Sequence, residues 1–205
     1  MLYLKVVYQL KFYKMLTFNF TPFPILQNSR LLLRRIVNED AIQVFELRSN
    51  PESMKFIPRP LHQNVDDSLA MIKMMNDKID ENIDINWAVT LIGSNKLIGI
   101  VGFYRVQPEN YRSEIGYIIS PEFNGKGITT EVVGLLLEYG FNTLNLNSFE
   151  AIIDPENFAS EKVLLKNNFV KEGHFKENGF YEGKFIDAVI YSILKRNFNS
   201  KKKYE

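Results

Sequence analysis

The spacing of apolar residues changes repeatedly along this chain, which predicts a mixture of strands and helices. Residues 31–36 begin with three leucines and predict a first strand. Apolar residues then recur at three- and four-residue steps in 41–47 and 69–79, which predicts two helices. Strand-like runs follow at 85–92, 97–106 and 113–120. Short polar connections join these runs, as is typical of antiparallel neighbours.

The second half of the chain alternates between the two kinds of pattern. It contains a helical stretch at 125–141, a strand at 149–153, a helix at 157–167 and strands around Phe169 and at 185–194. This order of elements predicts an α+β fold, in which a meander of strands is followed by alternating strands and helices.

The chain is expected to form a single folded domain with two short extensions. No internal repeat, low-complexity tract or Gly/Ser linker divides it, so the domain is assigned to residues 29–197. Residues 1–28 are interpreted as an N-terminal extension and residues 198–205 as a basic tail. Met15 is an alternative translation start.

Composition and charge argue against several classes of function. The 205 residues include 25 Lys and Arg against 24 Asp and Glu, a net charge of +1, which leaves no surplus for tracking nucleic acid or an anionic membrane. The longest uncharged run, residues 15–29, contains two prolines and is too short to span a bilayer. The absence of cysteine excludes disulfides, thiolate metal sites and a thioester intermediate on the enzyme. It is also compatible with a reducing cytosol.

A glycine-bearing loop between a strand and a helix is the most informative stretch. Residues 115–120 lead into Asn124-Gly125-Lys126-Gly127, and a helix follows directly. Unpaired backbone N–H groups and the positive end of the helix dipole converge at such a terminus, which favours phosphate binding. The competing interpretation is that two glycines only form a turn and start the helix. A Walker motif is excluded by the order Lys126-Gly127, and a Rossmann fingerprint is weak because antiparallel-looking strands precede the loop.

Several short motifs occur in an order that resembles the GNAT acetyltransferases, in particular the branch named after the ribosomal-protein-alanine N-acetyltransferases. The resemblance covers nearly all of residues 29–197, and the number, order and spacing of the motifs make it specific. The motifs are Leu31-Leu32-Leu33-Arg34, Ile85-Asn86-Trp87-Ala88-Val89, Leu97-Ile98-Gly99-Ile100-Val101-Gly102, Glu114-Ile115-Gly116-Tyr117, Pro121-Glu122-Phe123-Asn124-Gly125-Lys126-Gly127 and Asn157-Phe158-Ala159-Ser160.

This resemblance implies the GNAT fold, a mostly antiparallel twisted sheet flanked by helices and splayed between its fourth and fifth strands, here 113–120 and 149–153. Acetyl-CoA, the acetyl donor, would lie in that gap. Its pantetheine amides would pair with the strand edge at Ile118 and Ile119, and one N–H of that edge would polarise the thioester carbonyl. Its pyrophosphate would contact the backbone of Asn124, Gly125, Lys126, Gly127, Ile128 and Thr129.

The same resemblance points to two residues in the helix at 157–167. Asn157 matches an asparagine that contacts the pantetheine arm, although it is equally suited to be a helix N-cap, and both roles can hold at once. Ser160 matches a serine proposed to protonate the leaving CoA thiolate, and its alternative role is an ordinary first-turn serine. A tyrosine acid four residues later, more familiar in these enzymes, is ruled out because that position is Leu164.

The chemistry of acetyl transfer also calls for a base. Lysine has an ordinary pKa of about 10.4 and an α-amino group about 7.7 to 8.0, so the attacking amine must lose a proton. Glu114 is the candidate base, because it lies on the fourth predicted strand and shares a face with Gly116 and Ile118. The alternatives are a solvent-facing residue or an ion pair with Arg112 or Arg105.

The predicted function is therefore a cytoplasmic, acetyl-CoA-dependent N-acetyltransferase that transfers the acetyl group directly to an amine. The expected acceptor is the N-terminal α-amine of a ribosomal or other protein or of a peptide. The alternatives are a small amine, such as a polyamine, amino acid or aminoglycoside, and a non-catalytic acyl-CoA-binding regulatory module. An acidic acceptor groove would favour cationic amines, whereas an open groove would favour a peptide terminus.

Few further partners are expected. No metal site is predicted, because His62 and His174 lie far apart and lack acidic neighbours at ligand spacing. No membrane and no specific nucleic acid is expected as a partner, and the protein is expected to be a monomer or a homodimer.

Overall fold

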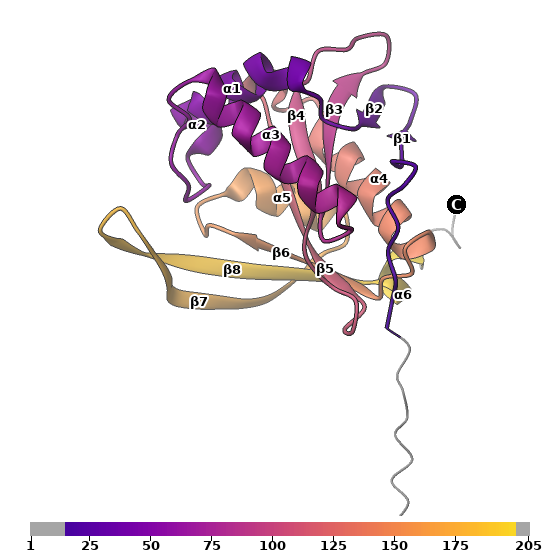
Figure 1. Ribbon diagram of the computed structural model, residues 1–205. Helices are drawn as coiled ribbons and strands as arrows, with labels where there is room; N and C mark the ends of the chain where they lie inside the picture. Colours follow the sequence, from indigo (N-terminus) through magenta and orange to yellow (C-terminus); the bar gives the residue numbers. More distant parts are fainter. Residues whose placement is uncertain (1–14, 200–205) are drawn as a thin grey trace, which may run out of the picture.

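One eight-stranded sheet forms the centre of the computed structural model, which describes residues 15–199 (Figure 1). Its strand order is β1-β2-β3-β4-β5-β6-β8-β7. The strands are β1 (Leu26–Gln27), β2 (Leu31–Arg34), β3 (Ile85–Leu91), β4 (Gly99–Gln107), β5 (Arg112–Ile119), β6 (Ser148–Ile153), β7 (Val170–Tyr181) and β8 (Lys184–Leu194). All neighbours are antiparallel except β5 and β6, which run parallel.

Helices cover both faces of this sheet (Figure 1). Residues of α1 and α3 pack on one face and residues of α4 and α5 on the other. The helices are α1 (Ala41–Ser49), α2 (Pro51–Met54), α3 (Val65–Asp80), α4 (Ile128–Asn142), α5 (Phe158–Lys166) and α6 (Lys195–Asn199). Short 3-10 helices over Asn38–Asp40 and Pro121–Phe123 precede α1 and α4. No helix within residues 15–199 is long and apolar enough to cross a membrane.

Alternating side chains of the central strands build two cores. Trp87 and Phe103 point to the α4 side, where the Trp87 ring meets those of Phe103 and Tyr139 edge-on at centroid distances of 5.5 and 5.8 Å. Ala88 and Ile100 point to the opposite face and pack against α1 and α3. The sheet is therefore buried on both faces at its centre, which makes it a rigid support for the residues at its edges.

The two strands at the parallel step separate after three residue pairs. Residues Arg112, Ser113 and Glu114 of β5 pair with Ser148, Phe149 and Glu150 of β6, and the pairing ends there. Beyond this point β5 pairs with β4 alone, and β6 pairs with β8 alone. The predicted α+β fold, with a sheet splayed between its fourth and fifth strands, is confirmed. These strands carry the labels β5 and β6 because the short β1 precedes them.

The segment before residue 29 belongs to the packed unit, which differs from the expected domain start. Phe18 and Phe20 are buried in the core on the α4 side, and β1 pairs with β2. The indole Nε1 of Trp87 donates a hydrogen bond to the Pro24 carbonyl at 2.7 Å. Residues 1–14, half of the expected N-terminal extension, and residues 200–205, most of the expected basic tail, lie outside the described residues. The alternative start at Met15 stays a prediction.

Two glycines of α4 should respond oppositely to alanine. A Cβ at Gly140 would lie 2.2 Å from Cζ of the fully buried Phe149, so Gly140→Ala is expected to destabilise the fold by about 1–3 kcal/mol. A Cβ at Gly134 would meet only Asn167 Oδ1 at 3.7 Å, so Gly134→Ala should stabilise it by about 0.5–1 kcal/mol. Urea unfolding of both variants measures this difference, and equal midpoints would contradict the packing described for α4.

Candidate active site

The gap between β5 and β6 exposes backbone groups that no strand satisfies. Ser120 N–H donates to the Ile98 carbonyl on the β4 side, and the Ile118 carbonyl also points toward β4, near Gly99. Because amide directions alternate along a strand, Tyr117 and Ile119 turn their backbone groups toward the gap instead. Of the two predicted edge residues, Ile119 is thus oriented toward a ligand in the gap, whereas the backbone groups of Ile118 pair with β4.

The loop after β5 has the geometry of an anion site. Gly125 and Gly127 have φ angles of +73° and +75°, which an L-residue rarely adopts. Gly127 is the N-cap of α4, so the N–H groups of the first turn, including those of Ile128 and Thr129, open toward the loop. Lys126 is exposed and its Nζ lies 5.2 Å from the centroid of the Phe123 ring. The predicted pyrophosphate loop therefore has both donors and a cation.

Arg30 adds a second cation to this loop, and sequence reasoning missed it. Its Nη2 donates to the Lys126 carbonyl at 3.0 Å and lies 3.5 Å from Glu131 Oε1 in the first turn of α4. Asn28 Nδ2 donates to the other oxygen of Glu131 at 3.1 Å. The residues just before β2 therefore fix the loop from outside, a contact with no local signal because 96 positions separate Arg30 and Lys126.

The start of α5 brings Asn157, Ser160 and Tyr117 together. Asn157 Oδ1 accepts the Ser160 backbone N–H at 3.1 Å, so Asn157 is an N-cap. A pantetheine contact would then have to come from the Asn157 side-chain NH₂ group. The Tyr117 hydroxyl donates to the Ser160 carbonyl at 3.5 Å, and burial raises the pKa of Tyr117 to about 12. A protonated phenol thus lies beside Ser160, a second candidate acid that the sequence did not reveal.

Glu114 lies where the sheet opens and is largely buried. Its side chain is 19% exposed, and its Oε2 accepts Arg105 Nη1 at 2.9 Å. Its register partners are Tyr104 on β4 and Glu150 on β6. Burial raises the pKa of Glu114, the nearby Arg105 opposes that rise and Glu150 adds to it. The ion pair with Arg105, one of the alternatives for Glu114, is present in the structure, while Arg112 binds Glu150 instead.

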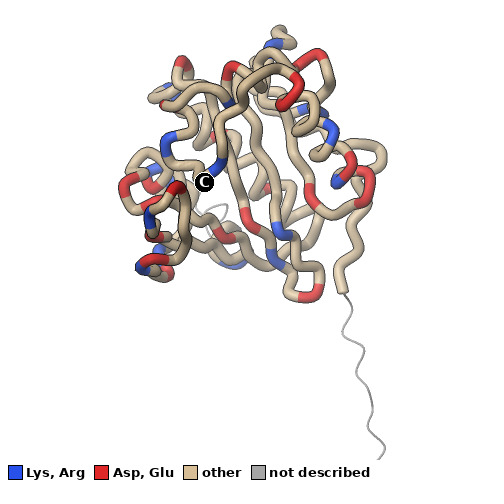
Figure 2. The backbone as a smooth tube through the Cα atoms, turned by 60° about the vertical axis from the view of Figure 1, so that its left-hand side comes forward, with Lys and Arg blue, Asp and Glu red and all other residues tan. Residues whose placement is uncertain are grey.

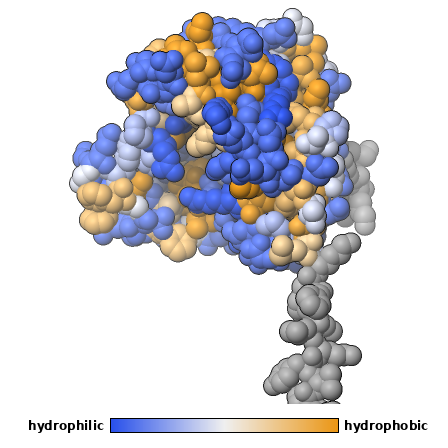
Figure 3. Space-filling model, viewed as in Figure 1, coloured by the Kyte–Doolittle hydropathy of each residue, from blue (hydrophilic) through white to orange (hydrophobic). Residues whose placement is uncertain are grey.

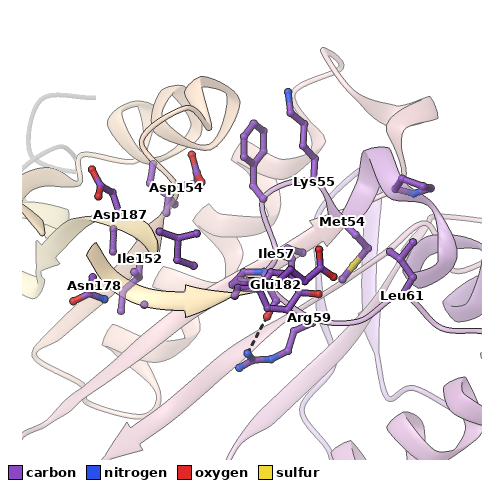
Figure 4. A pocket seen from close by; sticks show the side chains of 18 residues that line it. Met54, Lys55, Ile57, Arg59, Leu61, Ile152, Asp154, Asn178, Glu182 and Asp187 are labelled. Atoms are coloured by element: carbon purple, nitrogen blue, oxygen red, sulfur yellow. Dashed lines mark hydrogen bonds between the residues drawn. The ribbon is translucent and has the colours of Figure 1, made fainter. Parts of the chain in front are cut away.

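A cavity of about 450 Å³ lies between the segment after α2 and the β7–β8 hairpin. Figure 3 shows the corresponding hollow, and Figure 4 shows its side chains from close by. One wall comes from residues 51–61, including Met54, Ile57 and Arg59. The other comes from the end of β6, including Ile152 and Asp154, and from the hairpin. The cavity adjoins the β6 side of the gap, because β6 contributes to both.

The charges around this cavity are mixed. Lys55 and Arg59 stand on one wall, and Asp154, Glu182 and Asp187 on the other. Asp187 already accepts bonds from the Glu177 backbone N–H, Lys176 and His174, which lower the pKa of its carboxyl to about 2. Along the backbone in the view of Figure 2, Lys and Arg positions are interspersed with Asp and Glu positions.

Both histidines have hydrogen-bonding partners in the structure. His62 Nδ1 lies 2.8 Å from Ser68 Oγ, and His174 Nε2 lies 2.8 Å from Asp187 Oδ2. Asp187 is an acidic neighbour of His174 that strand pairing supplies and sequence spacing did not show. Within residues 15–199 no three side chains of metal-ligating type form a cluster.

Comparison with known proteins agrees with this architecture. The domain family described as "Acetyltransferase (GNAT) domain" matches residues 30–170. The chain belongs to the GNAT acetyltransferase family. The uncharacterized N-acetyltransferase YoaA of Bacillus subtilis is 34% identical over 173 residues, which cover 84% of this chain and 98% of that protein. The protein is therefore an N-acetyltransferase of this family, and a solved relative in the family binds CoA.

Two solved structures illustrate the range of acceptors among GNAT relatives. The spermidine N-acetyltransferase of Vibrio cholerae, solved with CoA and spermine, has a TM-score of 0.74 and 27% identity and covers 84% of this chain and 99% of its own. The ribosomal-protein-S5-alanine acetyltransferase of Vibrio fischeri has a TM-score of 0.75 and 22% identity. The match covers 85% of this chain and 98% of that protein and shows a shared fold. The acceptor must therefore be argued from this chain's own cleft.

Replacing Gly127 should weaken CoA binding without unfolding the protein. Gly127→Ala places an L-residue at a φ of +75°, so we expect the loop to shift and the affinity for CoA to fall about tenfold or more. Gly183→Ala is the matched control, since its φ of +79° brings similar strain at the tip of the β7–β8 hairpin. Isothermal titration calorimetry with CoA measures both. Equal affinities in the two variants would contradict an anion site at this loop.

Proposed function

We propose that the protein acetylates the N-terminal α-amine of a protein or peptide in a single transfer step. The amine nitrogen forms a bond to the thioester carbonyl carbon of acetyl-CoA while the carbon–sulfur bond breaks. The amine proton passes to Glu114, and the CoA thiolate takes a proton from a hydroxyl at α5. The observation that carries the proposal is the open, mixed-charge cavity beside the gap, with a buried carboxylate at the point where the strands separate.

The alternation of side chains along β5 supports base and acid on opposite sides of the donor. Glu114 lies on the face covered by α1 and α3, whereas Tyr117 packs in the core on the α4 side. An acceptor that approaches Glu114 would therefore meet the thioester from the face opposite to Tyr117 and Ser160. A neutral α-amine is easier to obtain than a neutral lysine side chain, because its ordinary pKa is about 7.7 to 8.0 against about 10.4.

The shape and charge of the cavity support a peptide rather than a compact cation. The hollow is open to solvent between the α2 region and the hairpin, so an extended chain can enter it (Figure 3). Its apolar side chains, such as Met54, Ile57 and Ile152, suit the first residues of a peptide. This acceptor is the one expected for the branch named after the ribosomal-protein-alanine N-acetyltransferases. We extend the proposal to a cytoplasmic location, which the absence of cysteine supports.

Polyamine acetylation is the second candidate. Asp154 and Glu182 on the β6 and hairpin side of the cavity are carboxylates that a polyamine could contact. The 27% identity to the spermidine N-acetyltransferase of Vibrio cholerae also favours it. Lys55 and Arg59 on the facing wall argue against a polyamine, because their positive charges would repel its second ammonium group.

Glu114→Gln should abolish the acid limb of the pH profile. Burial raises the pKa of Glu114, so kcat/KM of the wild-type enzyme should fall on acidification at a higher pH than an ordinary glutamate would give. In Glu114→Gln we expect kcat to drop by about 10²–10⁴ and this limb to disappear. Arg105→Met removes the cation that lowers the pKa of Glu114, so the acid limb of this variant's pH profile should move to higher pH. An unchanged profile in both variants would remove Glu114 from the mechanism.

A panel of acceptors, read out by mass spectrometry with acetyl-CoA as donor, tests the proposed function. We expect peptides with free N-terminal amines to be acetylated with higher kcat/KM than spermidine or lysine side chains. N-terminally blocked peptides that carry lysine are the control for side-chain acetylation. Faster acetylation of spermidine than of every peptide would favour the polyamine candidate. CoA binding without turnover on any amine would point to a non-catalytic binding module.

A further inference from the structure

Arg48, in the last turn of α1, carries a positive charge that no carboxylate neutralises. Five other arginines form ion pairs with Asp or Glu, namely Arg30, Arg34, Arg35, Arg105 and Arg112. Within residues 15–199 no salt bridge involves Arg48, and its Nε is fully buried without a hydrogen-bond partner. Burial lowers the pKa of Arg48, as expected for a cation withdrawn from water.

A half-buried guanidinium without a partner is unusual, because an unpaired buried charge is costly. Arginine cannot escape this cost by losing its proton, since its ordinary pKa is above 12. The cost is removed when an anion binds, and carboxylates bind the guanidinium fork through two parallel hydrogen bonds. Arg48 therefore has the features of a ligand-binding residue rather than a structural one.

Tyr104 connects Arg48 to the candidate base. Tyr104 is the register partner of Glu114, and its ring lies over Gly116, where an added Cβ would come within 2.8 Å of Tyr104 Cε2. Arg48 and Glu114 both act electrostatically on Tyr104. Burial raises the pKa of Tyr104, so its phenol stays neutral and cancels neither charge. Arg48 therefore lies within electrostatic range of Tyr104, on the sheet face that also carries Glu114.

Positive charge extends from Arg48 toward the cavity. Arg59 lines the cavity, and its positive charge adds to the effect of burial in lowering the pKa of Arg48. His62 donates its backbone N–H to the Arg48 carbonyl at 3.3 Å, and Arg48 lowers the pKa of that histidine in addition to its burial. Arg59 therefore places a second positive charge on the cavity wall, in the segment that follows Arg48 in the chain.

The acids near Glu114 already have partners of their own. Asp84 Oδ2 accepts Lys78 Nζ at 2.9 Å, and Glu150 binds Arg112. Glu114 itself binds Arg105, whose side chain is 65% exposed and can move aside. Asp84 Oδ1 and Arg112 Nε are also buried without a hydrogen-bond partner, but both residues are held in ion pairs, whereas Arg48 has none among the described residues. The partner that Arg48 lacks is an anion, which a polyamine cannot supply.

We propose that Arg48, assisted by Arg59, binds a carboxylate of the acceptor while the acceptor amine lies at Glu114. This inference rests on the proposed acetyl transfer and narrows its substrate to amines that carry a carboxylate a few bonds away. Two sources supply that chemistry, the carboxylate of a free amino acid and an acidic side chain close to a peptide N-terminus. Both carry an anion and an amine that are separated by a few bonds.

Matched acceptor pairs test the carboxylate preference. The pairs are an amino acid and its amide, and peptides that differ by Asp or Asn at the second residue. We expect the wild-type enzyme to prefer the acid of at least one pair by about tenfold or more in kcat/KM, and Arg48→Met to abolish that preference. Arg48→Lys should restore part of it. Arg35→Met, which removes an arginine already paired with Asp80, should leave it unchanged. The pair that shows the preference identifies the source of the carboxylate.

Three outcomes would overturn the inference. The first is equal kcat/KM of the wild-type enzyme for the acid and the amide in both pairs. The second is a fall in kcat/KM in Arg48→Met that is the same for the acid and the amide, which would indicate a structural role for Arg48. The third is a raised KM for acetyl-CoA in Arg48→Met, which would assign the arginine to the donor. If Arg48→Met does not fold, Arg59→Gln serves the same comparison and should weaken the preference.

A binding measurement separates this inference from the proposed function. Calorimetry on the CoA-bound protein compares an N-acetyl amino acid with its amide in wild type and Arg48→Met. Tighter binding of the acid that depends on Arg48 supports the carboxylate site even if no amine is turned over. Equal binding of acid and amide contradicts the site even if peptides are acetylated.

Discussion

The separation of β5 from β6 after Glu114 and Glu150 is the constraint on which the rest of the structure depends. Both strands remain paired on their other sides, β5 with β4 and β6 with β8, so neither can close the gap by shifting. Backbone N–H and C=O groups at the two facing edges must then be satisfied by water or by a ligand. An extended chain with amides of its own, such as pantetheine, satisfies them in the way that a missing strand would.

This opening also sets the positions at which side chains can act. Glycine at 102 and 116 leaves room on the α1 and α3 face, and Asn86 and Tyr104 lean into that room. Glu114 and Glu150 are neighbours in the last parallel pair, so their two negative charges repel each other. Arg105 beside Glu114 and Arg112 beside Glu150 offset this repulsion. A largely buried carboxylate whose pKa is raised by burial is the kind of group that can take a proton from an amine.

The sequence predicted those features that depend on local pattern, and it missed those that depend on pairing. The order of strands and helices and the glycine loop follow from periodicity and turn chemistry, and the N-cap at Asn157 follows from its residue type at a helix start. The splayed sheet was implied by the resemblance to the GNAT family. Strand β7 extends from Val170 to Tyr181, well beyond the strand predicted around Phe169, because an exposed edge strand of mostly polar residues lacks an apolar period. The contacts of Arg30 with the loop and of Tyr117 with Ser160 join distant residues, so only the fold reveals them.

In the proposed function, donor and acceptor are recognised by different parts of the chain, so the two specificities can change separately. The proposed donor site consists mainly of backbone groups along β5 and at the start of α4, which any residue provides if it tolerates the backbone angles. The acceptor cavity consists of side chains from residues 51–61 and from the β7–β8 hairpin, two segments more than 100 positions apart in the chain. Substitutions in these segments can change charge and shape without disturbing the sheet. The acceptor therefore has to be inferred from side-chain charges such as those of Arg48 and Arg59, because the backbone geometry of the proposed donor site carries no information about the acceptor.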